Sequence, residues 1–158
     1  LTLDHLIGIN ATTGAVFEPW AAFRRRSSAE MGLHLMVYAE TDARCVLHSH
    51  AVTSLWFCDL HPDVDQVEVS GLEILKAFPG VNSHTESVSI PVFSNDQDIE
   101  LLAERARQSV SQCPGFLIRG HGLTCWGSSV SEAQKYLEAF NYLFTYYTQA
   151  PRAYGGTR

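Results

Sequence analysis

Two histidines directly follow a short apolar run in the sequence Cys45-Val46-Leu47-His48-Ser49-His50. Its apolar start predicts a short buried strand, and side chains two residues apart on a strand leave from the same face. His48 and His50 can therefore direct their rings to one point. A second apolar run, Phe116-Leu117-Ile118, leads into Arg119-Gly120-His121-Gly122. Glycine on both sides of His121 allows a sharp turn and a close backbone approach, which suits the presentation of one ring at a site.

Three neutral imidazoles are a known catalytic ligand set for zinc, because they leave a fourth coordination position open for water or substrate. A histidine taken alone also has an ordinary explanation, since imidazole is a frequent polar group of cores and surfaces. Four of the seven histidines are placed in that ordinary class: His5, His34, His61 and His84, with His34 as a candidate to support the site from behind. Cys45 is not expected to be a ligand, because it lies three residues before His48 and so on the opposite face of the strand.

Length and composition narrow the class of protein. A chain of 158 residues with 46% hydrophobic residues fits one globular domain, and no apolar run is long enough to cross a membrane. The net charge of -6 argues against nucleic acid or an anionic membrane surface as a partner. The basic run Arg24-Arg25-Arg26 is either a solvated edge or an attractor for a phosphorylated substrate. We expect no secretory leader, and the four cysteines lack Cys-X-X-Cys spacing, which is typical of reduced thiols in a cytoplasmic protein.

Strand and helix patterns alternate along the chain, which predicts an α/β fold in layers around one sheet. The expected strands are a hairpin over 3–10 and 15–17, then 44–48, 66–69, 87–93 and 115–119. The expected helices are one capped by Ser27 or Ser28 and running to 40, then 51–59, 72–78, one from Asn95 to 111, and one opened by a Ser129-X-X-Glu132 capping box. The aromatic side of the last helix is expected to lie in the core or at a subunit contact, and not to bind a cofactor.

Four motifs follow one another along the chain: Ser28-Ala29-Glu30, Leu33-His34, His48-Ser49-His50 and Gly120-His121-Gly122. In this order they resemble the signature of the class II aldolase/adducin family, and the resemblance runs from about Leu3 to Tyr147. It implies a single-domain α/β/α fold around a mainly antiparallel sheet over residues 1–150, with the N-terminal part missing and 151–158 as a flexible tail. It also implies one zinc ion (Zn2+) per subunit, held by His48, His50 and His121.

Three further features resemble the dehydratase branch of this family. They are Glu73 within Gly71-Leu72-Glu73-Ile74-Leu75-Lys76, the run Pro91-Val92-Phe93-Ser94-Asn95-Asp96-Gln97-Asp98-Ile99, and Trp126-Gly127 after the Gly-His-Gly motif. This resemblance implies zinc-dependent dehydration of 5-methylthioribulose 1-phosphate to 5-methylthio-2,3-dioxopentyl 1-phosphate in methionine salvage. It makes Glu73 the catalytic acid/base. Without the resemblance, Glu73 would be taken for a solvated carboxylate on a short amphipathic helix.

The resemblance extends to residues near the start of the first helix. Glu30 matches a glutamate that lies at the metal of the aldolases and acts there as acid/base, so it is a second catalytic candidate. It would hold a metal-bound water in the empty site or orient a ligand; otherwise it is a carboxylate favoured by the helix dipole. Ser27 and Ser28 match serines near the substrate phosphate.

Two other functions stay open. Zinc-stabilised enediolate chemistry serves a sugar-phosphate aldolase or epimerase, like the fuculose-phosphate aldolases, as well as it serves a dehydratase. A non-enzymatic interaction module like the adducin heads is the third possibility, although those heads lack the intact histidine set. In either enzyme the partner is a phosphorylated ketose, and the resemblance implies a cytoplasmic homo-oligomer, a tetramer, with sites near subunit contacts.

Overall fold

The computed structural model describes residues 5–18, 20 and 26–149. Its elements follow the order α1 (Met31–Glu40), β1 (Cys45–Ser49), α2 (Val52–Asp59), β2 (Gln66–Ser70), the 3-10 helix η2 (Glu73–Ala77), β3 (Ser87–Phe93), α3 (Ile99–Arg107), β4 (Gly115–Ile118), β5 (Gly122–Gly127) and α4 (Val130–Gln149). The five strands form one sheet in the order β1-β5-β4-β3-β2. Only β3 and β4 run parallel among these neighbours. The expected mainly antiparallel α/β fold is confirmed.

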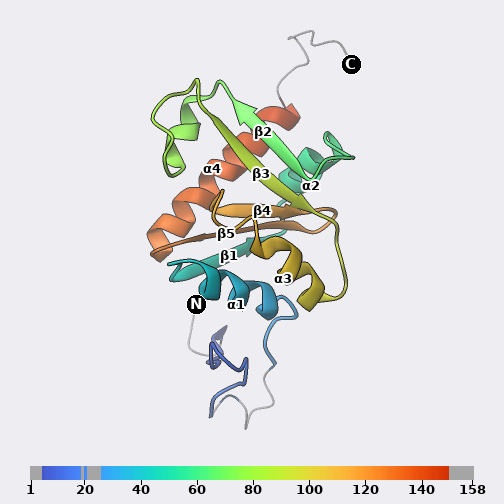
Figure 1. The fold of residues 1–158 in the computed structure, drawn as a ribbon, viewed down its shortest axis with the longest axis vertical. Coiled ribbons are helices and arrows are strands. Elements are labelled where there is room, and N and C mark those ends of the chain that lie inside the picture. The colour runs from blue at the N-terminus through green and yellow to red at the C-terminus, as the bar shows by residue number, and fades with distance from the viewer. Residues whose placement is uncertain (1–4, 19, 21–25, 150–158) are drawn as a thin grey trace.

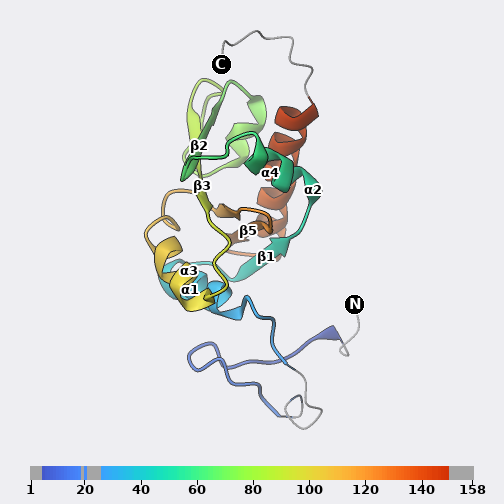
Figure 2. The same ribbon diagram turned by 90° about the vertical axis from the view of Figure 1, so that its right-hand side faces the viewer.

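The sheet lies between two pairs of helices, with α1 and α3 on one face and α2 and α4 on the other (Figures 1 and 2). Side chains alternate along the strands and so divide the core in two. Val46 packs with Phe116 and Trp126 against α1 and α3. Leu47 points the other way and packs in the core beneath α2 and α4, together with Cys125. His48 therefore shares the α1 side of the sheet with Val46.

Two helices begin later than the sequence predicts. α1 starts at Met31, because the Ser28 hydroxyl accepts a hydrogen bond from the Glu30 N–H at 3.2 Å and closes a turn ahead of the helix. α3 is capped by Asp98 and not by Asn95, since the Asp98 carboxylate accepts hydrogen bonds from two free N–H groups of the first turn. The buried side of α3 is apolar and consists of Leu102, Ala103 and Ala106.

Other elements match their predictions in part. The segment predicted as a helix over 72–78 is the 3-10 helix η2. The predicted N-terminal hairpin contributes an isolated bridge between Ile9 and Val16 among the described residues, and Leu3 lies outside them. The Ser129 hydroxyl does cap α4 by accepting from the Glu132 N–H, while the Glu132 carboxylate turns to Ser128. The aromatic side of α4 lies in the core. No helix of the described residues is both long and apolar enough to cross a bilayer.

β5 was not predicted as a strand, although it organises the sheet. It pairs with β1 on one side and β4 on the other, both antiparallel. All six of its residues are buried, so its sequence has no alternation to reveal it. The turn before it needs its glycines: Gly120 has a φ of 64°, and a Cβ on Gly122 (φ 158°) would collide with the Ser49 carbonyl oxygen. This close approach joins the end of β1 to the β4–β5 turn.

We predict that Gly122→Ala lowers the free energy of unfolding in a urea titration more than Gly71→Ala does. Gly71 also has positive φ (81°), but nothing lies within 4 Å of a Cβ built there. Gly71→Ala should therefore lower the free energy of unfolding by only ~1–2 kcal/mol, which is the cost of placing a side chain on a residue with positive φ. Gly122→Ala adds the collision with Ser49, and overpacking typically costs about 1–3 kcal/mol more. Equal losses of unfolding free energy in the two variants would contradict the close approach of Gly122 to the Ser49 carbonyl oxygen.

Candidate metal centre

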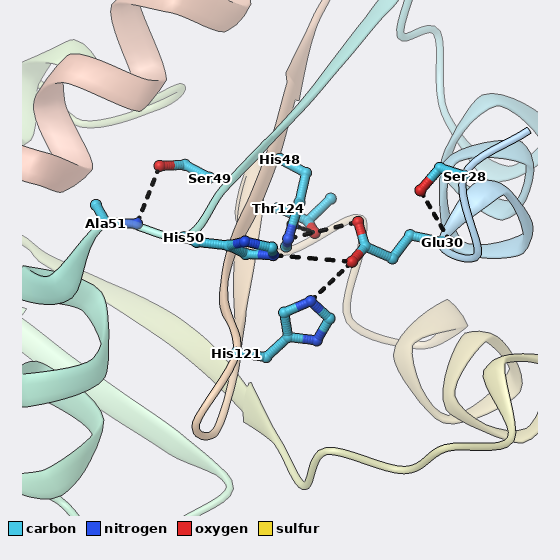
Figure 3. A network of polar contacts seen from close by, with 8 residues as sticks. All are labelled: Ser28, Glu30, His48, Ser49, His50, Ala51, His121 and Thr124. Carbon is cyan, nitrogen blue, oxygen red and sulfur yellow. Dashed lines mark hydrogen bonds and ion pairs between the residues drawn. The ribbon is translucent and has the colours of Figure 1, made fainter.

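Four side chains from three separate parts of the chain meet at one end of β1 (Figure 3). His48 lies on β1, and His50 follows the end of that strand. His121 lies in the turn between β4 and β5, whose pairing with β1 returns it to the same place. Glu30 is the N-cap residue of α1, which packs on the same side of the sheet. The structure thus brings together the three histidines that the sequence singled out and Glu30, the second catalytic candidate of the sequence analysis.

The donor atoms of this group lie within 4.8 Å of one another. Glu30 Oε1 is 2.7 Å from His121 Nε2 and 3.9 Å from His50 Nε2, and Glu30 Oε2 is 3.4 Å from His48 Nε2. The three rings have centroids 4.6–4.9 Å apart. Three imidazole nitrogens and one carboxylate oxygen therefore converge on a common point.

This arrangement fits a divalent cation. His48 Nε2 is buried and has no hydrogen-bond partner, which is costly unless something else satisfies it. Imidazole and carboxylate are ligands that zinc and related transition metals accept, and three histidines are a known zinc set. It is the one such group of His, Cys, Asp and Glu found among the described residues, and Cys45 is outside it.

Thr124 is a residue of the centre that the sequence did not suggest. Its hydroxyl lies 3.1 Å from His48 Nδ1, whereas Nε2 is the ring nitrogen that contacts Glu30. Thr124 pairs with His48 in the β1–β5 register and is 1% exposed. Recognition of β5 as the partner of β1 would have been the signal, because directly opposed residues on one face of a sheet are in contact.

Burial shapes the electrostatics of the centre. Desolvation lowers the pKa of His48, the neighbouring His121 and His50 lower it further, and Glu30 opposes them. Burial also lowers the pKa of His34, which lies one helical turn after Glu30. A lowered pKa keeps an imidazole neutral, and the neutral form is the one that can bind a metal.

The other predicted site residues are placed differently. Glu73 lies on η2 with 72% of its side chain exposed. It contacts Lys76 and His84 and does not join the group of Glu30, His48, His50 and His121. Ser28 is exposed and supports the turn at Glu30, and Ser27 is half-buried. Trp126 is buried against Phe116 and belongs to the core.

The other residues considered in the sequence analysis are the arginine run, His34 and the cysteines. Arg24 and Arg25 lie outside the described residues, and Arg26 is exposed. His34 is half-buried, with an Nε2 atom that has no hydrogen-bond partner. The four cysteines are free, as expected.

Comparisons with known proteins agree with this geometry. Residues 1–148 match the family described as Class II Aldolase and Adducin N-terminal domain. Methylthioribulose-1-phosphate dehydratases from Enterobacter sp. (strain 638) and Cronobacter sakazakii (strain ATCC BAA-894) are 39% and 40% identical over 148 residues, which cover 91% of this chain and 70% of theirs. The crystal structure of L-fuculose-1-phosphate aldolase from Thermus thermophilus has the same fold, with a TM-score of 0.61 at 20% identity over 93% of this chain and 71% of that one. The chain belongs to the class II aldolase and adducin family.

Proposed function

We propose that this protein is a hydro-lyase that removes water from 5-methylthioribulose 1-phosphate and gives 5-methylthio-2,3-dioxopentyl 1-phosphate. The reaction would use one zinc ion per subunit. It would belong to methionine salvage and take place in the cytoplasm. The observation that carries the proposal is the convergence of three imidazoles and a carboxylate within 4.8 Å. The relatives that carry this dehydratase name, at about 40% identity over most of the chain, support the choice of substrate.

His48, His50 and His121 would hold the ion, and Glu30 completes the set from the opposite side. A divalent cation there supplies Lewis-acid stabilisation of the negative charge that develops on the substrate when its C3 proton leaves. Glu30 faces all three rings, so it can orient the ligands and hold a proton on Oε1 or Oε2 beside them. The exposed side chain of His50 leaves this side of the centre open to a substrate.

Dehydration needs an acid/base group besides the ligands. One carboxylate must take the C3 proton or deliver a proton to the C4 hydroxyl as it departs. We assign this role to Glu73. The hydrogen bond from Lys76 lowers the pKa of the Glu73 carboxyl and keeps it ionised at neutral pH, the form that a general base requires. Because Glu73 is exposed and does not join the three proposed ligands of its own chain, it would act in the centre of a neighbouring subunit of a homo-oligomer, which we expect to be a tetramer.

Ser27 and Ser28 are assigned to the substrate phosphate. They immediately precede the turn that places Glu30, so a phosphate bound by them would lie beside the ligand set. The proposed partner is thus a small phosphorylated ketose, and neither a membrane nor nucleic acid is expected to take part.

An aldolase or epimerase is the second candidate, and the position of Glu30 among the ligands favours it. A carboxylate at the ion can serve as acid/base for cleavage between C3 and C4 or for epimerisation without any contribution from Glu73. A purely adducin-like interaction module is disfavoured, because it would have no use for three convergent imidazoles, one of them with a buried unpartnered nitrogen.

The first test combines metal content with product analysis. Zinc-loaded protein should consume 5-methylthioribulose 1-phosphate and release no aldehyde, whereas an aldolase would release an aldehyde and dihydroxyacetone phosphate. His121→Ala should keep the far-UV circular dichroism of the wild type and lose zinc affinity by more than the roughly 10–100-fold typical of residues behind the ligands. Unchanged zinc content in this variant would rule out the centre, and aldehyde release by the wild type would replace the dehydratase with an aldolase.

The second test separates the two carboxylates. Glu73→Gln should lower kcat by about 10²–10⁴-fold, the usual contribution of a general acid/base, while zinc affinity stays at the wild-type level. Glu68→Gln removes another exposed carboxylate, from β2, and serves as the matched control that should leave kcat unchanged. Full activity of Glu73→Gln would assign the proton transfer elsewhere, with Glu30 as the next residue to change.

A further inference from the structure

Thr124 places a hydroxyl where the fold otherwise has apolar side chains. It lies on β5 with 1% of its surface exposed, on the side of the sheet that carries the buried Val46 and Trp126. A buried hydroxyl is unfavourable unless it makes a hydrogen bond. Among the described residues, the one side-chain partner of this hydroxyl is His48 Nδ1 at 3.1 Å.

His48 is the most enclosed of the three histidines. Its side chain is 12% exposed, compared with 21% for His121 and 66% for His50. A buried imidazole needs a protein partner for the nitrogen that carries its proton. Thr124 is at Nδ1, and Nε2 is buried, unpartnered and directed toward Glu30 Oε2 at 3.4 Å. The two ends of the ring therefore have different neighbours.

We propose that Thr124 is a positioning residue that holds His48 ready to bind the ion. The Thr124 hydroxyl accepts a hydrogen bond from the Nδ1–H of His48, which leaves the lone pair of Nε2 free and aimed at the common point of the ligands. The hydrogen bond made by one ring nitrogen fixes the proton on that nitrogen and fixes the ring orientation. This inference rests on the proposed metal function and adds a residue to it.

The β1–β5 pairing explains why a threonine can do this. His48 and Thr124 are directly opposed on the neighbouring strands β1 and β5, so their side chains lie next to each other on the same face of the sheet. The β-branched side chain has few rotamers, so its hydroxyl has a defined position. Valine has the same shape without the acceptor, which makes Thr124→Val a specific test.

The experiment measures zinc affinity by competition with a chelator, in wild type, Thr124→Val and Thr124→Ser. Thr124→Val should bind zinc about 10–100-fold more weakly, as is usual when the partner behind a metal-bound histidine is lost. Thr124→Ser keeps the acceptor and should bind zinc nearly as tightly as the wild type. Ser89→Ala, which removes a buried and unpartnered hydroxyl from β3, is the control for a general effect of lost hydroxyls and should bind zinc normally.

Urea unfolding of the metal-free proteins separates positioning from a structural role. Thr124→Val leaves the buried Nδ1 of His48 without its partner, so the metal-free variant should lose about 1–3 kcal/mol of unfolding free energy and stay folded in the absence of urea. Weaker zinc binding by this folded variant supports the proposal. A metal-free Thr124→Val that is already partly unfolded without urea, or wild-type zinc affinity in this variant, overturns it.

A third readout does not use the metal. Nitrogen-15 NMR of the imidazole rings in the metal-free protein should show the proton of neutral His48 on Nδ1, and Thr124→Val should change this tautomer balance. A proton on Nε2 in the wild type overturns the proposal for Thr124. Failure of the wild type to bind zinc at all would instead overturn the proposed function, so the two failures are distinct.

Discussion

The antiparallel pairing of β1 with β5 is the constraint on which the centre depends. β5 lies between β1 and β4, so this one ladder fixes the end of β1 against the turn that carries His121. Gly122 allows the approach, because any side chain there would meet the Ser49 carbonyl. Helix α1 then packs its buried side on the same face of the sheet and delivers Glu30. A local change in this ladder would displace three ligands at once.

The burial of His48 affects the free energy of folding as well as metal binding. Buried polar atoms without partners cost about 1–3 kcal/mol each, and His48 Nε2 is such an atom in this structure. Burial also lowers the pKa of His48, so its protonation as pH falls below the ordinary value of 6.5 works against the folded state. An ion bound to the folded chain and not to the unfolded chain would offset these costs by mass action. The polar cluster is thus unfavourable for the empty fold and favourable for the loaded one.

The sequence was informative wherever a pattern was local. The apolar run before His48 located β1, the Ser129-X-X-Glu132 capping box located the start of α4, and the glycine-framed His121 pointed to the centre. It failed where the deciding contact is between segments distant in the chain. β5 is buried along its whole length, so it has no alternating pattern, and Thr124 could not be found without the register that β5 sets. The start of α1 was misplaced because Ser28 closes a turn instead of capping the helix.

The two candidate carboxylates illustrate how environment divides chemical roles. Glu30 is largely enclosed and lies beside three imidazoles, so that together they form a set of ligands for a cation. Glu73 is exposed beside Lys76, where its charge is stabilised by solvent and by one ammonium group. A general base must come within hydrogen-bond distance of the proton that it moves. Among the described residues of one chain, Glu30 is the carboxylate that lies at the ligand set, so the proposed role for Glu73 requires that another subunit cover the open side at His50. If dehydration is the reaction, its distinction from aldol cleavage lies in that contact and not in the ion, because the same cation chemistry serves both outcomes.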